Sequence, residues 1–274
     1  GKAIALMQSG WALGYMAAAG LSAWILPQYG WRVLFVLGML PALLTIFVRQ
    51  AVVEPAIWST RKEPTGTLAD LFRGGLAKRT IAATVLATCV LFAYWGLNTW
   101  LPTFLSKPLS AGGAGLSIVR SFTYVALAQI GTFAGYLTFG YLSDRYGRRP
   151  SFAFYVTMAA IVSLAYGTAP RWAGASSETV LLGLGPLVGF FGTGFFSLFG
   201  SMLAELYPTR IRGTGQGFAY NFGRGISALA PFAVGALADR YGIGAALTMN
   251  AAFFLLGALL VFTLPETRGT KLES

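Results

Sequence analysis

The hydrophobic positions of this sequence are grouped into long stretches without charge, of which residues 80–104 are a clear case. Eight such stretches, bounded by charged residues, Pro or Gly, reach the roughly 20 residues that a helix needs to cross a bilayer. Because lipid offers the backbone no hydrogen-bond partner, helices are the expected form. The predicted spans are residues 4–26, 31–50, 79–105, 119–142, 151–169, 179–204, 213–238 and 244–264. The pattern predicts an all-α membrane protein with eight transmembrane helices.

The composition agrees with a membrane protein and excludes most enzyme chemistry. Hydrophobic residues make up 55% of the chain and charged residues 11%, against about 25% charged residues in soluble proteins. The sequence contains no His, the usual general base and metal ligand, and its single Cys cannot form a disulfide within the chain. We therefore expect neither catalysis nor a metal or other cofactor.

The basic residues are distributed unevenly between the two sides that eight spans define. The chain has 20 Lys and Arg against 9 Asp and Glu, a net charge of +11. Five basic residues fall on one side, Arg224 falls inside a span, and the others share the side of both chain ends. Because cytoplasmic loops carry the excess of Lys and Arg, both chain ends are expected on the cytoplasmic side. The protein is then expected to be a multi-pass protein of the plasma membrane. Contact with lipid headgroups then accounts for the positive charge, without nucleic acid as a partner.

One sizeable connection, residues 53–78, separates the second and third predicted spans. Within it, Thr67 and Asp70 have the spacing of a helix start ahead of two apolar residues. Two interpretations remain open for this segment: a short amphipathic helix at the membrane interface, or a solvated linker.

The first two and the last two predicted spans resemble each other. When Gly1 is aligned with Gly213, the dipeptide Tyr-Gly at 29–30 meets the same dipeptide at 241–242. Such a repeat is typical of a duplicated helix bundle. Since the sequence also lacks an initiator Met, we expect a piece of a twelve-helix protein built from two six-helix halves. The expected parts are the last two helices of the N-terminal half at 1–52, a cytoplasmic linker at 53–78 and the complete C-terminal half at 79–274.

Three short motifs lie at the ends of predicted spans: GYLSDRYGRR at 140–149, ELYPTRIRG at 205–213 and PETRG at 265–269. Together they resemble the turns of the major facilitator superfamily, in particular its sugar-porter-like and metabolite:proton symporter branches. The resemblance covers the whole chain, as helices five to twelve of a twelve-helix transporter. Where sugar porters have a P-E-S-P-R-like segment this chain has VEPAIW at 53–58, which disfavours a sugar as the solute.

The resemblance implies that charged residues of these turns form ion pairs that close the inner gate and break during transport. Partly exposed ion pairs are worth about 0 to 1 kcal/mol each, weak enough to open in every cycle. Anchoring at lipid headgroups is the alternative role for the arginines. The gate residues carried over by position are Asp144, Arg145, Arg148, Arg149, Glu205 and Arg212.

Arg224 is a charged residue in the middle of a predicted span. It follows Arg212 by about twelve residues, which places it ~18 Å along a helix and near the bilayer centre. Burying a guanidinium there costs about 2.5 to 3.5 kcal/mol, so it should face the interior of the bundle. No Asp or Glu lies at mid-depth in the eight spans. Arg224 either binds an anionic solute or pairs with a carboxylate from helices ahead of Gly1.

Other polar residues at mid-depth are candidates for the same cavity. Asn221 lies one turn from Arg224 on its helix, and Tyr94 and Asn98 lie one turn apart in the third span. Hydrogen bonding between helices is the alternative role for such side chains. The candidate solute-binding residues are Arg224, Asn221, Tyr220, Asn98, Tyr94 and Gln129, with Trp95 and Gln216 nearby.

Two pairs of glycines indicate close helix packing. Gly131 and Gly135 lie four residues apart in the fourth span, as do Gly185 and Gly189 in the sixth. Small residues at this spacing let two helix backbones approach each other. We expect packing, rather than solute binding, to be their role.

The sequence as a whole predicts a secondary transporter that moves a small organic anion, such as a carboxylate metabolite, by alternating access. Proton symport is implied by the resemblance only, because the predicted spans contain no mid-depth carboxylate or His to carry the proton. Two alternatives remain: a porter of neutral sugars or polyols, in which Arg224 has a structural role, and a truncated product that does not transport.

Overall fold

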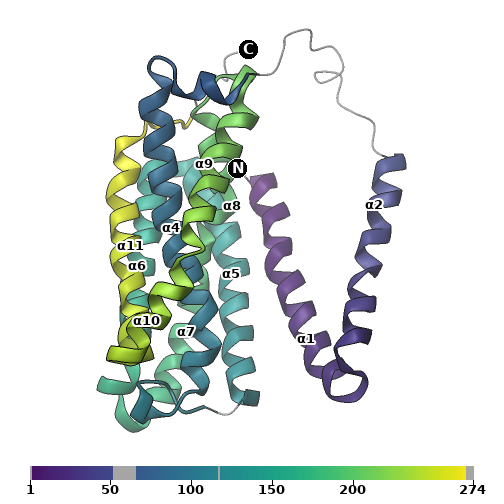
Figure 1. Ribbon diagram of the computed structural model, residues 1–274, viewed down its shortest axis with the longest axis vertical. Helices are drawn as coiled ribbons and strands as arrows, with labels where there is room; N and C mark the ends of the chain where they lie inside the picture. Colours follow the sequence, from purple (N-terminus) through teal and green to yellow (C-terminus); the bar gives the residue numbers. More distant parts are fainter. Residues whose placement is uncertain (1, 52–65, 117, 270–274) are drawn as a thin grey trace. The chain divides into compact units, whose positions relative to one another are not determined.

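The computed structural model describes residues 2–51, 66–116 and 118–269, and these are almost entirely helical, with no strand among them (Figure 1). The chain divides into two compact units: residues 13–65 form one, and residues 1–12 together with 66–274 form the other. The all-α class predicted from the sequence is confirmed for the described residues.

The smaller unit contains most of α1 (Lys2–Gly38) and all of α2 (Leu40–Ala51). Gly30 interrupts α1 with φ 74° and ψ 174°, a backbone conformation that glycine adopts without steric cost. The chain therefore turns at the Tyr29–Gly30 dipeptide that separates the first two predicted spans.

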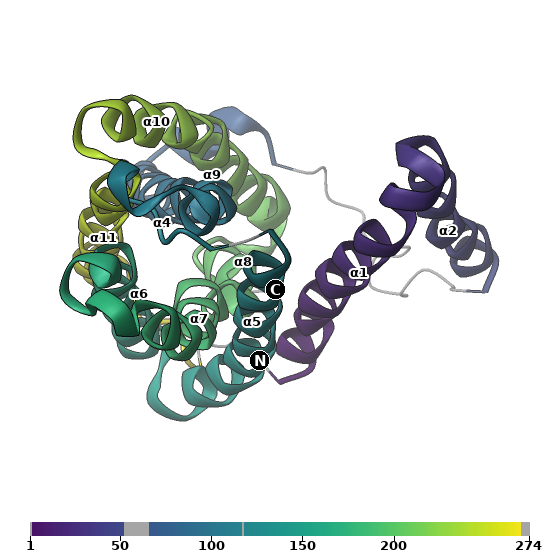
Figure 2. The ribbon, with the colours of Figure 1, turned by 90° about the horizontal axis from the view of Figure 1, so that it is seen from below.

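Among the described residues, the larger unit contains eight complete α-helices, five short 3₁₀ helices and the first residues of α1 (Figures 1 and 2). Most of the connections between the helices are short. The α-helices are α4 (Leu76–Ser106), α5 (Ile118–Tyr146), α6 (Arg148–Trp172), α7 (Ser177–Gly194), α8 (Phe196–Glu205), α9 (Arg212–Ser227), α10 (Ala230–Tyr241) and α11 (Ile243–Leu260). The 3₁₀ helices are η1 (Leu68–Phe72), η2 (Leu109–Ala111), η3 (Gly174–Ser176), η4 (Thr209–Ile211) and η5 (Val261–Thr263).

Six helical stretches of the described residues are long and apolar enough to cross a membrane, so the predicted count of eight is not confirmed. The six are Trp24–Ala51, Leu76–Ser106, Thr123–Tyr146, Arg148–Trp172, Ser177–Glu205 and Ile243–Thr263. The first predicted span, 4–26, does not qualify on its own. The seventh, 213–238, falls on α9 and α10 and is too polar in its first half.

The break between α9 and α10 has a local cause. Pro231 has no backbone N–H to donate to the carbonyl four residues earlier, so the helical hydrogen-bond pattern is interrupted just ahead of it. The indole N–H of Trp100 on α4 donates to the Pro231 carbonyl oxygen at 2.8 Å. This bond fixes the start of α10 against α4.

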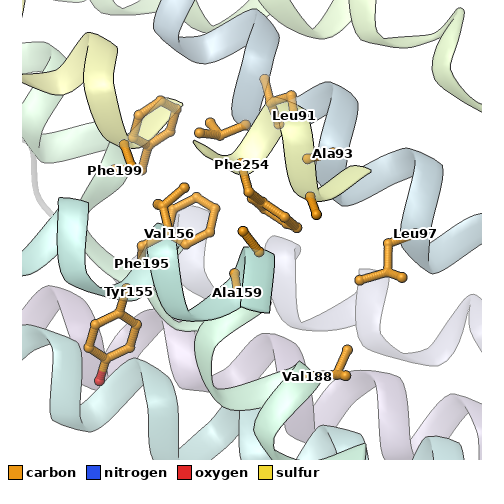
Figure 3. Packing of buried hydrophobic residues seen from close by; sticks show 14 of the residues in the cluster. Leu91, Ala93, Leu97, Tyr155, Val156, Ala159, Val188, Phe195, Phe199 and Phe254 are labelled. Carbon is orange, nitrogen blue, oxygen red and sulfur yellow. The ribbon is translucent and has the colours of Figure 1, made fainter. Parts of the chain in front are cut away.

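The core of the larger unit includes aromatic and aliphatic side chains of α4, α6, α7, α8 and α11 (Figure 3). Phe195, at the junction of α7 and α8, and Phe254 of α11 are fully buried. The Phe199 ring of α8 stacks on Phe152 of α6 with centroids 5.6 Å apart. These buried rings contribute to the packing between α6, α8 and α11.

Helices α5 and α7 approach each other through the glycines that the sequence indicated. A methyl group at Gly189 would overlap the carbonyl oxygen of Ala128, and one at Gly131 would overlap that of Pro186. The hydroxyl groups of Thr193 and Thr132 are 2.9 Å apart across the same interface. The predicted packing role of these glycines is confirmed.

The end of the predicted linker packs on the larger unit. Thr67 and Asp70 start η1, as predicted: the Thr67 backbone N–H donates to the Asp70 carboxylate at 2.9 Å. Leu71 is fully buried, and the Asp70 carboxylate lies 3.4 Å from the Arg210 guanidinium. A short helix thus forms at residues 68–72, as the first of the two interpretations expected, and it packs beside the start of α9. Residues 53–65 of the predicted linker lie outside the described residues, and its residues 76–78 belong to α4.

The glycine contact between α5 and α7 can be tested by adding one methyl group. We expect Gly189→Ala to destabilise the protein by about 1 to 3 kcal/mol, because its Cβ meets backbone atoms of α5 that cannot move aside. Thermal unfolding in detergent can be followed through labelling of the buried Cys89 thiol. Gly183→Ala on the same helix, where the space is open, is the matched control and should unfold like the unchanged protein. Equal melting temperatures for the two variants would contradict the prediction.

Candidate functional site

A pocket of about 400 Å³ opens in the larger unit between α4, α5, α8, α9 and the first residues of α1. Its wall is mainly aromatic, with a few polar groups that converge from different helices. This volume lies in the range of roughly 300 to 1,000 Å³ that small-molecule sites occupy. Lining side chains with polar groups are Gln8, Tyr94, Tyr136, Gln216, Tyr220 and Arg224.

Arg224 supplies the positive charge of this pocket. Its Cζ atom lies 5.7 Å from the centroid of the Trp95 ring on α4, a cation–π contact. Among the described residues, no carboxylate forms an ion pair with Arg224, and its guanidinium donates no hydrogen bond. The group therefore keeps its hydrogen-bonding capacity for a ligand.

Three of the six residues predicted to bind solute line the pocket: Tyr94, Tyr220 and Arg224. Trp95 and Gln216, noted beside them in the sequence, line it as well. The Tyr94 ring makes an edge contact with the Trp95 ring, with the two ring centroids 5.3 Å apart, so the aromatic wall beside Arg224 is continuous.

The other three predicted residues do not line the pocket. The Asn98 amide donates to the Tyr94 carbonyl oxygen at 3.1 Å, and the Asn221 amide donates to the Gly217 carbonyl oxygen at 2.9 Å. Both amides thus bond within their own helix rather than to a neighbouring one. Gln129 is half-buried on α5, away from the lining.

Sequence analysis missed seven of the twelve lining residues: Gln8, Trp11, Leu91, Tyr136, Phe196, Phe199 and Gly200. Tyr136 of α5, only 6% exposed, reaches the pocket. Phe196 at the start of α8 also lines it, and its ring makes an edge contact with the Tyr94 ring, with the centroids 5.0 Å apart. Tyr136 directly follows Gly135, whose backbone contacts Phe190 of α7, so for Tyr136 the available signal was this glycine. Phe196 follows the buried Phe195, and no comparable signal marked it in the sequence.

A charge cluster lies where α5 ends, α6 begins and α8 ends. One guanidinium nitrogen of Arg148 lies 2.7 Å from the Asp144 carboxylate, and the other lies 3.2 Å from the Glu205 carboxylate. The Arg148 side chain is 12% exposed, and the Thr267 hydroxyl also bonds to Glu205. The structure thus joins three predicted gate residues through a single arginine.

The other three predicted gate residues make different contacts. Among the described residues, none of them pairs with a carboxylate. Arg145 donates to the Tyr141 hydroxyl at 3.1 Å. Arg149 donates to the Phe262 carbonyl oxygen at 2.9 Å. Arg212 donates to the Thr209 hydroxyl at 3.1 Å.

Glu266, in the closing motif, has a role that the sequence did not reveal. Its carboxylate accepts the backbone N–H groups of Arg148 at 2.9 Å and Arg149 at 3.0 Å, which are the first two of α6. Helix N-termini favour such negative charge. Gly147, with φ 108°, turns the chain directly beside this carboxylate, and a side chain there would crowd it.

These bonds also set the ionisation of Glu266. Partial burial alone would raise its pKa, but hydrogen bonds from four backbone N–H groups, of Arg149, Arg148, Arg268 and Thr267, outweigh burial and hold the pKa below its usual value. The ionised carboxylate therefore fastens the closing segment to the start of α6.

Comparison with known proteins places the chain in a family. A sequence profile of the Major Facilitator Superfamily matches residues 1–137 and 109–274. The chain is 34% identical over 285 residues to a probable 4-methylmuconolactone transporter of Cupriavidus pinatubonensis, covering 100% of this chain and 63% of that protein. It is 30% identical over 271 residues to a cis,cis-muconate transport protein of Acinetobacter baylyi, covering 95% and 63% of the two chains. A niacin transporter of the same organism is 27% identical over 310 residues, covering 100% of this chain and 67% of that protein.

The chain belongs to the Major Facilitator Superfamily, and it is a multi-pass membrane protein of the transporter class rather than an enzyme. It spans 63% of the length of the first two relatives and 67% of the third. The resemblance drawn from the three turn motifs is therefore confirmed.

Removal of Arg148 tests the charge cluster. We expect Arg148→Met to destabilise the larger unit by about 1 to 3 kcal/mol, because two partly buried carboxylates lose the cation that they share. Arg145→Met, which removes an exposed guanidinium bonded to a tyrosine hydroxyl, is the control and should have little effect. The free energy of unfolding, measured by denaturant titration in detergent, decides between them. Similar losses for both variants would contradict a special role for Arg148.

The pH dependence of Glu266 can be tested with Glu266→Gln. A carboxyl whose pKa is lowered by folding stabilises the folded state at a pH above its unfolded pKa, about 4.3, and this contribution is lost as the pH falls through the folded pKa. The melting temperature of the unchanged protein should exceed that of the variant at pH 7, and the difference should shrink below pH ~4. A difference that stays constant down to the lowest pH tested would show that the carboxylate charge is not involved.

Proposed function

We propose that the protein is a secondary transporter that moves small organic anions across the plasma membrane by alternating access, with Arg224 binding the carboxylate of the solute. The observation that carries this proposal is the Arg224 guanidinium, which lines an aromatic pocket and pairs with no carboxylate of the described residues. A guanidinium binds a carboxylate through two parallel hydrogen bonds, and it gains most where water is excluded.

The relatives support an anionic solute. Two of them are described as transporters of muconate and of niacin, which are both carboxylates. A neutral sugar or polyol would leave the Arg224 charge without a counter-charge in the pocket. Tyr94, Tyr220 and Gln216 would then bind the remaining polar groups of the solute.

The proposed architecture keeps the eight spans. Here α9 and α10 act as one broken span, and residues 1–52 supply two helices of an N-terminal half, followed by the linker at 53–78. Residues 79–274 form the C-terminal half, and both ends face the cytoplasm. The distribution of basic residues supports this orientation.

The charge cluster is proposed as part of the inner gate. Asp144, Arg148 and Glu205 would hold the ends of α5, α6 and α8 together in one state and separate in the other. Both carboxylates remain partly exposed, so water can solvate them when the ion pairs separate. The more exposed contacts of the remaining three arginines suit the alternative role at lipid headgroups.

Proton symport remains part of the proposal on the strength of the family resemblance. Coupling requires an ionisable group whose charge changes during the cycle. The described pocket lining has no Asp, Glu or His in that role. Residues of this chain thus bind the solute, and none of the described lining residues is assigned to carry the proton.

Loss of the Arg224 charge is the direct test. The unchanged protein in detergent should bind benzoate and nicotinate but not the neutral benzamide and nicotinamide, as measured by isothermal titration calorimetry. Arg224→Gln should weaken carboxylate binding about 10-fold to 150-fold, the range for hydrogen bonds to a charged group. Arg224→Lys should bind with intermediate affinity, since an ammonium group cannot reproduce the two parallel bonds.

Arg171→Gln is the matched control, because Arg171 is an exposed arginine at the end of α6 and outside this pocket. It should leave binding unchanged. Unaltered carboxylate binding by Arg224→Gln, or binding of a polyol in place of the acids, would overturn the proposal.

A further inference from the structure

The pocket around Arg224 is far richer in aromatic rings than the chain as a whole. Seven of its twelve lining residues are Phe, Tyr or Trp, whereas these residues make up 15% of the sequence. Binding a carboxylate alone would need only the guanidinium and a few hydrogen-bond donors. The rings therefore indicate a preference about the rest of the solute.

The rings of this wall differ in how much of their surface is engaged. Phe196 and Phe199 contact each other and Phe195 in the core, with centroids 4.3 to 6.3 Å apart. Tyr94 presents its ring to both Trp95 and Phe196. The Trp95 ring is half-buried, and it is the ring that lies against the Arg224 guanidinium.

The contact between Arg224 and Trp95 links charge recognition to shape. A carboxylate that pairs with the guanidinium through two bonds lies in the guanidinium plane. In an acid whose π system is conjugated with its carboxylate, the rest of the molecule continues in that plane. Such a solute can extend from Arg224 along the aromatic wall, whereas a saturated ring or chain is puckered and makes a poorer contact with a flat ring face.

We infer that Trp95 is a specificity-determining residue that makes the pocket prefer flat, conjugated carboxylates to saturated carboxylates of the same size. This inference rests on the proposed function, because it takes Arg224 as the carboxylate site. Trp95 holds the guanidinium while the pocket is empty and offers its ring to the solute once the carboxylate has paired.

Two pairs of acids separate conjugation from charge and size. Benzoate and cyclohexanecarboxylate share a six-membered ring and one carboxylate, and cis,cis-muconate and adipate share a six-carbon chain and two carboxylates. The unchanged protein should bind the conjugated member of at least one pair about 2-fold to 10-fold more tightly, the range expected for one aromatic contact. Calorimetry on the full chain in detergent gives both dissociation constants.

Trp95→Leu should bring the ratio of the two dissociation constants close to one, because it weakens binding of the conjugated acid. The affinity for the saturated acid should stay within about twofold of the unchanged protein's. Trp95→Phe keeps a smaller ring and should retain part of the ratio. Trp172→Leu, which removes an exposed tryptophan at the end of α6, is the control and should keep the full ratio. If Trp95→Leu does not fold, as judged by gel filtration, the ratio of Trp95→Phe decides: an unchanged ratio overturns the inference.

The outcomes distinguish the inference from the proposed function. An unchanged ratio in Trp95→Leu, or equal losses for conjugated and saturated acids, overturns the role of Trp95 while the Arg224 site stands. Failure of the unchanged protein to bind any of the four acids overturns both. A preference for the saturated acids overturns the inference alone.

Discussion

The close contact of α5 with α7 and with the start of α8 is the constraint on which the aromatic pocket depends. Gly135 faces the Phe190 backbone, and a methyl group at Gly194 would lie 3.0 Å from the Gly135 carbonyl group. Tyr136 follows Gly135 directly, Phe196 lies two residues after Gly194, and both line the pocket. Because two backbones in close contact cannot rotate independently, the glycine contacts constrain how these two segments present their side chains.

Arg224 lies in this pocket near the end of α9, three residues before the helix stops at Ser227. A guanidinium in an apolar bundle is costly unless it has a partner, and the described residues provide the face of Trp95 rather than a carboxylate. A cation–π contact offsets part of that cost and leaves the hydrogen-bond donors available. The same contact thus explains how the charge is tolerated without solute and why a carboxylate would bind.

Helix α8 connects the pocket to the charge cluster. Phe196 at its start faces the pocket and Glu205 at its end bonds to Arg148, so the two sites are separated by one short helix of about 15 Å. Glu266 fastens the start of α6 at the same end of the bundle. A change in the ion pairs would therefore act on α8 as a rigid unit, which gives the proposed gate a physical route to the aromatic wall.

The sequence by itself determined the helical class, the membrane character, the glycine contact, the turn motifs and the position of Arg224 along its helix. Each of these follows from local properties, namely hydrophobicity over one span, charge, or the absence of a side chain. Only the tertiary structure decided that Tyr136 and Phe196 line the pocket while Asn98 and Asn221 bond within their own helices. It also divided the polar predicted span 213–238 into α9 and α10. The physical reason is that a helix apolar on all sides carries no periodicity to show which face turns inward, so the contacts with its neighbours set its rotation.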